Sequence, residues 1–184
     1  MMRAWKIVSG GLFVVILILI AAMLWQNQQV KKELIRDYIL HHSNIEYSLR
    51  LSIDEYEKSQ DTEQLADDLF IAYGAATVTT RKPVNIHQLT GIPYINNVDF
   101  LYEIRDQFDF YLPGAVKAAS DDARDGELTE AQYQNLQGYQ QLLLEFMELT
   151  VDEDFGEKSV SDFEDDFKTF YEKNEVKISE LINN

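Results

Sequence analysis

The chain has 184 residues, with 16 Lys or Arg, 32 Asp or Glu and no cysteine, so its formal net charge is −16. Without cysteine, thiol nucleophiles and thiolate metal sites are excluded. The acidic residues are unevenly distributed along the chain. Residues 1–60 have a net charge of +1, whereas residues 61–184 hold 9 basic and 26 acidic residues, a net charge of −17. Such a surface repels phosphates and shows no basic patch with interleaved aromatics, so we expect no nucleic-acid partner.

The first element is an apolar run over residues 7–25, IVSGGLFVVILILIAAMLW, which contains no charged residue. Nineteen helical residues cover about 28 Å, close to the hydrocarbon thickness of a bilayer. Trp5 and Trp25 flank the run, as indole rings do at a headgroup interface. The run therefore predicts a retained membrane-spanning anchor that contacts the lipid bilayer through residues such as Ile7, Leu12, Phe13, Ile16, Ile20 and Trp25.

A cleaved signal peptide and a buried soluble helix are the alternatives to an anchor. The apolar run is longer than the usual 7 to 15 residues of a signal peptide, and the sequence from Ala21 to Trp25 ends in bulky residues where a cleavage site needs small ones. Its length also exceeds that of most buried helices. The anchor is the favoured interpretation.

Orientation is predicted from the charges that flank the anchor. Arg3 and Lys6 precede it, while Lys31, Lys32 and Arg36 follow, so the count of positive charge is nearly even. The six-residue leader resembles the cytoplasmic tail of a signal anchor, and a chain without cysteine suits an extracytoplasmic domain that has no disulfides. We therefore expect a single-pass protein of the cell membrane, with residues 1–6 cytoplasmic and the rest outside.

Residues 26–60 are predicted to form a membrane-proximal helical stalk, either separate from the following domain or part of its bundle. One apolar face recurs every three, four or seven residues; it comprises Val30, Leu34, Tyr38, Ile45, Leu49, Ile53 and Tyr56. Ile35, Ile39 and Leu40 widen it beyond a two-stranded seam, so a bundle is favoured, with a homodimer through this face as the alternative. Ser43 and Glu46 have capping-box spacing, which predicts a break near Ser43.

Residues 61–184 are predicted to form one acidic helical domain. Asp61 and Gln64 start a helix that ends before Pro83, with an inward face of Leu65, Leu69, Phe70 and Tyr73. The stretch KPVNIHQLTGIPYINN, residues 82–97, is rich in turn residues and predicts an ordered loop. It is either a plain connection or, because long loops often carry function, a partner-binding segment.

Three further helical stripes follow this loop. The first ends at Pro113-Gly114 and comprises Phe100, Leu101, Ile104, Phe108, Tyr111 and Leu112. After a short helix, Thr129 and Gln132 open the next one, with Tyr133, Leu136, Leu143 and Met147 facing inward. Ser161 and Glu164 are predicted to cap the last helix, whose inward face is Phe163, Phe167, Phe170, Tyr171, Ile178 and Leu181. The fold class is therefore all-α: one N-terminal transmembrane helix followed by a compact bundle of about five helices.

The stretch Asp121–Gln132 resembles a calcium-binding loop in part. Asp121, Asp125 and Gly126 fall in the required register, but Ala123 replaces an oxygen ligand and Gln132 replaces the bidentate glutamate. A helix end at Gly126 followed by a cap at Thr129 explains the same residues without a metal. We therefore expect no metal site, with Asp121 and Asp125 as weak candidates.

No catalytic or cofactor motif is present. The histidines are His41, His42 and His87, and they do not have the spacing of a zinc site. No phosphate-binding glycine loop or nucleophile elbow occurs. We therefore expect no enzyme and no cofactor, and a function in binding another protein or an envelope component. The alternatives are a carboxylate-based envelope hydrolase, or a calcium-responsive sensor through the Asp121–Gln132 loop.

Overall fold

The computed structural model describes residues 2–81, 104 and 106–183, and within them the chain is helical and contains no strand. The predicted all-α fold class is confirmed. The elements, in chain order, are α1 (Met2–Ser59), α2 (Thr62–Arg81), the short π-helix η1 (Asp106–Tyr111), α5 (Leu112–Asp125), α6 (Glu130–Thr150) and α7 (Val160–Asn183).

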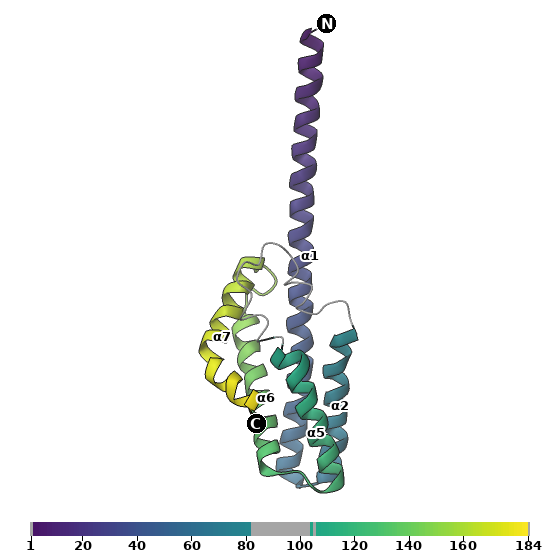
Figure 1. The fold of residues 1–184 in the computed structure, drawn as a ribbon, viewed down its shortest axis with the longest axis vertical. Helices are drawn as coiled ribbons and strands as arrows, with labels where there is room; N and C mark the ends of the chain where they lie inside the picture. Colours follow the sequence, from purple (N-terminus) through teal and green to yellow (C-terminus); the bar gives the residue numbers. More distant parts are fainter. Residues whose placement is uncertain (1, 82–103, 105, 184) are drawn as a thin grey trace.

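Helix α1 is a single helix of 58 residues. At about 1.5 Å per residue it is roughly 87 Å long, and its first half projects from the rest of the molecule as an isolated rod (Figure 1). The predicted break near Ser43 is wrong, because the helix runs through this residue. Ile39, Ile45 and Leu49 on either side are fully buried, so packing holds the backbone helical across the capping sequence.

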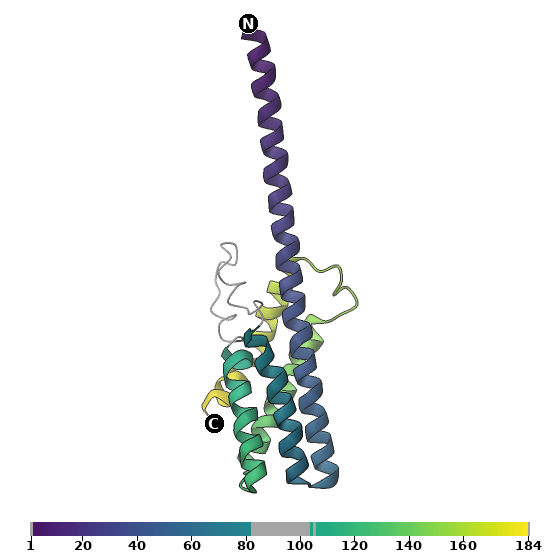
Figure 2. The same ribbon diagram turned by 90° about the vertical axis from the view of Figure 1, so that its right-hand side faces the viewer.

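The remaining helices surround the second half of α1. α1 packs against α2 and α6, α5 packs against both α2 and α6, and α7 covers α6. Successive helices run in alternating directions, so the folded part is an antiparallel bundle with α7 as an outer layer (Figures 1 and 2). The segment 26–60, predicted as a stalk or as part of the bundle, contributes Ile35, Tyr38 and Ile53 among others to the core.

Small residues line the contact between α2 and α5. Ala66, Ala72 and Ala76 of α2 are fully buried, as are Ala119 and Ala123 of α5. Short side chains let two helix backbones approach closely. The Ser120 hydroxyl crosses this contact and donates a hydrogen bond of 2.7 Å to the Ala66 carbonyl oxygen. The apolar periodicity of the sequence does not predict these alanines as core residues.

Aromatic rings fill the centre of the bundle. Phe146 of α6 is fully buried, and its ring centroid lies 5.2 Å from those of Phe108 and Phe170, and 5.4 Å from that of Phe167. Tyr38 of α1 meets it edge-on at 6.4 Å. One side chain therefore connects α1, η1, α6 and α7.

The predicted helix end at Pro113-Gly114 is wrong. Pro113 lies in the first turn of α5, and Tyr111 before it keeps helical dihedral angles, with φ −72° and ψ −47°. Proline is tolerated there because the first N–H groups of a helix have no intrahelical acceptor. The π-helix η1 ends at Tyr111 and α5 begins at Leu112, so the chain stays helical through this proline.

Two predicted helix starts, at Asp61 and at Thr129, are confirmed. Asp61 Oδ1 accepts from the backbone N–H of Glu63 and Gln64, but the Gln64 side chain bonds to Glu55 instead of closing a capping box. Thr129 and Gln132 form the complete capping box of α6.

Helix α7 begins at Val160, and its cap is Ser159, two residues before the predicted cap at Ser161. Ser159 and Asp162 bond reciprocally: the Ser159 N–H donates to Asp162 Oδ2, and the Asp162 N–H donates to Ser159 Oγ. Aspartate serves at the third position as glutamate would, and the prediction placed the box on the wrong serine.

Most predicted inward positions are buried or half-buried, but some large apolar side chains are exposed. These exceptions are Val30, Leu40, Phe70 and Tyr111. At these positions the apolar pattern extends beyond the part of each helix that packs against the bundle.

Candidate functional site

The apolar half of α1 makes no contact with the bundle. Every side chain described between residues 11 and 30 is exposed. Leu12 and Phe13 are each 62% exposed, and Trp25 is 68% exposed; Ile16 and Ile20 are about half exposed. Ile7 lies in α1, but its side chain is outside the described part. By length and composition this helix can cross a membrane. Large exposed apolar surfaces of this kind are typical of sites that contact lipid or protein.

The folded bundle begins directly after this apolar segment. Lys31 is 1% exposed and Ile35 is 2% exposed, so the core starts ten residues beyond Trp25. Ten helical residues correspond to about 15 Å, roughly twice the thickness of one headgroup layer. No loop separates the apolar segment from the core residues. The two halves of α1 are therefore joined without a flexible linker.

Lys31, which follows the apolar segment, interacts electrostatically with the start of α7. The pKa of Lys31 is lowered by burial, which a charge interaction with Glu164 of α7 partly opposes. Burial likewise raises the pKa of Glu164, and Lys31 limits that increase. The two opposite charges thus face each other at the end of the bundle that adjoins the apolar segment.

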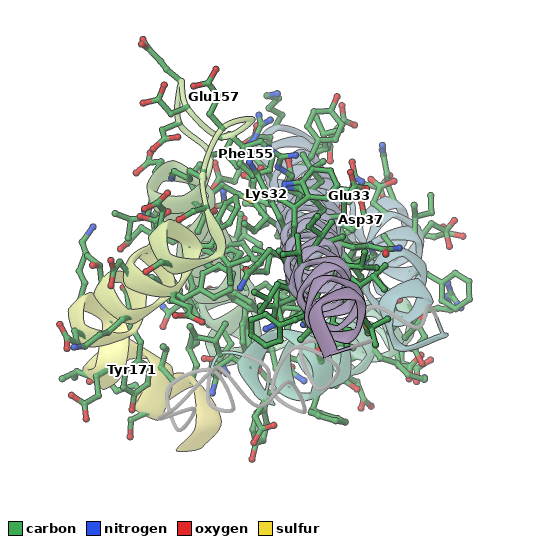
Figure 3. All side chains as sticks on the ribbon, turned by 90° about the horizontal axis from the view of Figure 1, so that it is seen from above. Lys32, Glu33, Asp37, Phe155, Glu157 and Tyr171 are labelled. Carbon is green, nitrogen blue, oxygen red and sulfur yellow. The ribbon has the colours of Figure 1, made fainter. Side chains whose placement is uncertain are left out.

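Arg36 connects α1 to the loop between α6 and α7. Its Nη2 donates a hydrogen bond of 3.3 Å to the Phe155 carbonyl oxygen, and its guanidinium carbon lies 5.8 Å from the Phe155 ring centroid. Seen from the amino-terminal end, Phe155 and Glu157 lie on this loop, with Lys32 nearby on α1 (Figure 3). The loop is therefore fixed against the helix that carries the apolar segment.

The buried Lys158 side chain also fixes the loop between α6 and α7. Its Nζ donates to the Thr150 carbonyl oxygen at 3.2 Å, and it pairs with Asp152 at 2.8 Å and Asp166 at 2.7 Å. Burial by itself would lower the pKa of Lys158, but the hydrogen bonds and charges of Asp152 and Asp166 more than offset it, so the pKa is raised. The charged amine is thus the form that the fold stabilises.

We expect Lys158→Met to lower the free energy of unfolding by about 2 kcal/mol, because a buried carbonyl loses its donor and two carboxylates lose their counter-ion. The matched change Lys168→Met removes an exposed pair with Glu172 at 3.7 Å and should cost less than about 0.5 kcal/mol. Because the folded pKa is raised, the Lys158 contribution is complete below the ordinary pKa of 10.5 and disappears as the pH rises through the folded value. Urea unfolding of the full chain in detergent micelles, followed by circular dichroism, measures both. Equal costs for the two variants would contradict the assignment.

A buried polar group lies where α1 meets η1. His42 is fully buried, and its Nδ1 donates to the Tyr38 carbonyl oxygen at 2.8 Å, because a carbonyl oxygen can only accept. Its Nε2 faces Asp109 Oδ1 at 3.6 Å. Gln107, also from η1, is fully buried, and none of the described residues hydrogen-bonds to its amide. Tyr38, Phe108 and Phe146 rings surround the imidazole, so this pair belongs to the core rather than to an open catalytic site.

A largely apolar groove of about 400 Å³ runs between α5 and α6 near the end of α7. Phe110 is 61% exposed and Tyr111 is 43% exposed at its edge. Tyr139 lies in the groove wall, and its burial raises its pKa to about 12. The other lining residues are Gly114, Ala115, Ala118, Gln132, Asn135 and Leu181. Exposed aromatic rings beside a concave apolar surface are typical of a binding site.

A second groove, of about 260 Å³, lies at the opposite end of the bundle from the apolar segment and contains Glu57 and Glu130. Glu57 accepts hydrogen bonds from Tyr133 and Gln137, and Glu130 accepts one from Gln134. A glycoside hydrolase needs one protonated carboxyl group and one ionised one. Here the described contacts of both carboxylates are hydrogen bonds from neutral amide and hydroxyl donors.

The weak calcium candidates do not converge. Asp121 lies in α5 and pairs with Lys117, while Asp125 is the last residue of that helix. Gly126 ends the helix with φ 74°, and Gln132 donates to Asp122 as well as capping α6. Among the described residues, no three His, Asp or Glu side chains lie together as metal ligands would. The capping explanation of this stretch is confirmed.

We expect calcium to leave the melting temperature of the full chain in micelles unchanged. A ligand that binds only the folded state at 100 times its Kd would stabilise it by about 2.7 kcal/mol, a shift that calorimetry detects easily. A rise in melting temperature with calcium that Asp121→Asn abolishes would show the sequence resemblance to be functional.

The loop at residues 82–97, predicted as a connection or a partner-binding segment, lies outside the described residues. Within the described part, the sequence analysis missed the contacts of Arg36 with Phe155 and of Lys158 with its two aspartates. The only signal was a lysine set among acidic residues near a predicted helix start, and spacing alone could not select its partners.

No protein-family model matches the sequence, and no curated protein or solved structure matches it either.

Proposed function

We propose that this chain is a single-pass membrane protein that holds an acidic helical domain directly against the bilayer surface and acts by binding another protein or an envelope component. The observation that carries the proposal is the division of α1, whose first half is apolar and exposed and whose second half forms the core of the domain. A helix shared in this way fixes the distance and the tilt of the domain relative to the membrane.

The proposed location is the cell membrane, with the amino terminus in the cytoplasm and the domain outside. Arg3 and Lys6 in the short leader support this orientation, as does a domain that needs no disulfide. Alkaline extraction of membranes combined with protease treatment of intact cells tests anchoring and sidedness together. The chain should stay with the membrane at alkaline pH, and external protease should remove the domain. Extraction of the chain by alkali would contradict the anchor. Protection of the domain from external protease would indicate the opposite orientation.

The groove edged by Phe110 and Tyr111 is the surface we propose for binding. Large exposed rings supply contact area at low entropic cost, and such residues dominate the energy of many interfaces. Chemical crosslinking in native membranes should recover a partner from the wild type and much less from Phe110→Ala. Val176→Ala, which removes an isolated side chain that is 71% exposed, is the matched control. Recovery of lipid alone, or equal loss in both variants, would contradict this surface.

We propose binding rather than catalysis because the groove edged by Phe110 and Tyr111 is lined mainly by apolar and aromatic side chains. The groove that contains Glu57 and Glu130 is the place to test the hydrolase alternative. Glu57→Gln together with Glu130→Gln should leave any envelope phenotype of the wild type intact. Loss of that phenotype with the fold retained would favour the hydrolase.

A further inference from the structure

The side of α1 that faces away from the bundle carries a regular pattern of its own. The positions on this side, which we call the outer stripe, are spaced alternately three and four residues apart: Val30, Glu33, Asp37, Leu40, Asn44, Tyr47, Leu51 and Asp54. All are exposed except Asp54, which is half-buried. In Figure 2 this part of α1 lies at the margin of the bundle. The spacing is that of the a and d positions of a coiled coil.

The middle of the outer stripe is apolar. Leu40 is 48% exposed, Tyr47 is 53% exposed and Leu51 is 42% exposed, which is high for side chains of this size in one row. Asn44 lies between them at an a position. A single asparagine at such a position fixes the register of parallel two-stranded coils. The end nearer the apolar segment is acidic, with Glu33 and Asp37 next to each other (Figure 3).

Anchoring in a bilayer dictates how two copies of α1 can meet. If both insert in the same direction, their helices are parallel and each residue lies at the same depth as its counterpart. Leu40, Tyr47 and Leu51 would then each face their own copies. This geometric step rests on the proposed function, since freely soluble chains have no such constraint.

Charge next to the stripe is complementary between two parallel copies. In a parallel coil the residue before an a position lies close to the residue five positions later in the other helix, which pairs Arg50 with Glu55. Arg50 is 44% exposed in its side chain and bonds to Glu46 on the same helix through Nε at 3.3 Å. Arg50 therefore brings a positive charge to a surface that is otherwise acidic.

An acidic groove adjoins Leu51. It has a volume of about 270 Å³ and is lined by Ser48, Leu51, Ser52, Glu55, Gln64, Asp68 and Ile71. Burial, together with the charges of Glu55 and Asp67, raises the pKa of Asp68. Glu55 and Asp68 thus place two carboxylates at this groove, and Ile71 beside them is 66% exposed. An incoming arginine and an apolar ring would match both properties.

We propose that α1 pairs with a second copy of itself in a parallel homodimer, through the outer stripe from Leu40 to Leu51. The homodimer expected from the sequence uses the apolar face that includes Tyr38, Ile45 and Leu49. Those side chains are buried in the bundle of their own chain, so the face that remains for pairing is the outer one.

The proposed contact is small. Four side chains over three turns bury far less than the roughly 1,200–2,000 Å² of a standard stable interface. Pairing therefore depends on confinement to the membrane, which raises the effective concentration of the second copy. Repulsion between the like charges of Glu33 and Asp37 restricts the contact to the stretch beyond them.

The absence of cysteine makes disulfide scanning direct, because each single substitution introduces the sole thiol. Leu40→Cys, Asn44→Cys, Tyr47→Cys and Leu51→Cys should give a disulfide-linked dimer in oxidised native membranes. Ser43→Cys and Ser48→Cys, which flank the stripe, should give several-fold less, and Lys168→Cys on α7 should give none. Product mass must equal twice that of the chain.

Three outcomes would overturn the dimer. They are no product at the four stripe positions, equal yields at all positions from 40 to 51, and a product of another mass. Alkaline extraction of the same membranes separates this failure from that of the proposed function. A chain that stays in the membrane but gives no periodic product loses the dimer alone.

A charge exchange tests the orientation independently. In the Tyr47→Cys background, Arg50→Glu should reduce the dimer yield several-fold because it places like charges together. Adding Glu55→Arg should restore the yield, since the pair is then reversed. Failure of the double exchange to restore the product, with helical content unchanged, would contradict the parallel register.

Discussion

Replacement of both Ile16 and Ile20 with arginine is expected to move the protein from the membrane fraction to the soluble or degraded fraction. These residues lie one turn apart near the centre of the apolar segment. Each arginine at the centre of a membrane helix costs about 3 kcal/mol, so the pair costs about 6 kcal/mol, comparable with the favourable contribution of the twelve Ile, Leu, Val and Phe residues. Fractionation followed by immunoblotting measures the change.

The matched control for this experiment is Val30→Arg. Val30 is exposed on the same helix but lies five residues beyond Trp25, where an arginine side chain reaches the headgroups. This variant should stay in the membrane fraction. Release of the control together with the double variant would mean that the boundary of the spanning segment is misplaced, and retention of both would mean that residues 7–25 do not span the bilayer.

Removal of the central ring by Phe146→Ala should lower the free energy of unfolding by about 3–5 kcal/mol, as expected for a fully buried phenylalanine. The loss is large because the same ring packs on α1, η1 and α7, so no single helix can move to fill the cavity. Urea unfolding of the full chain in micelles, followed by circular dichroism, is suitable because both tryptophans lie at residues 5 and 25, outside the bundle.

Phe146→Leu is the control for shape. It keeps most of the volume and should cost about 1 to 2 kcal/mol. The exposed ring of Phe110 offers a second comparison, since Phe110→Ala should leave stability nearly unchanged. A cost below 1 kcal/mol for Phe146→Ala would contradict its place at the centre of the core.

Helical periodicity was sufficient to predict the fold class and most of the core. Phe163, Phe167 and Phe170 recur at helical spacing and are all buried, as the pattern predicts. Thr129 and Gln132 were identifiable as a cap because the motif is local. Helical spacing and the capping motif both involve residues that are close together in the chain, so both can be identified from the sequence alone.

Local signals failed wherever a contact between distant residues decided the outcome. The Ser43 sequence has the form of a cap, but burial of the residues around it keeps α1 continuous. Pro113 was interpreted as a helix end because the preceding π-helical turn has no sequence pattern that we could use. The alanines between α2 and α5 were missed because a small apolar residue fits a surface and a close helix contact equally well.

The contacts next to the apolar segment show the same limit. Lys31 and Arg36 are flanking charges in the topology prediction, whereas in the structure Lys31 interacts electrostatically with Glu164 at the start of α7 and Arg36 hydrogen-bonds to the loop before it. Their partners lie more than 100 residues away in the chain. The sequence shows the charges, but only packing of α7 against α1 brings the pairs together.

The most direct test of the central claim is the intact mass of the mature protein recovered from the membrane fraction. Our account predicts a mass that includes the complete apolar segment, with the protein resistant to alkaline extraction. A mature chain that begins after Trp25 and is recovered in solution would contradict it.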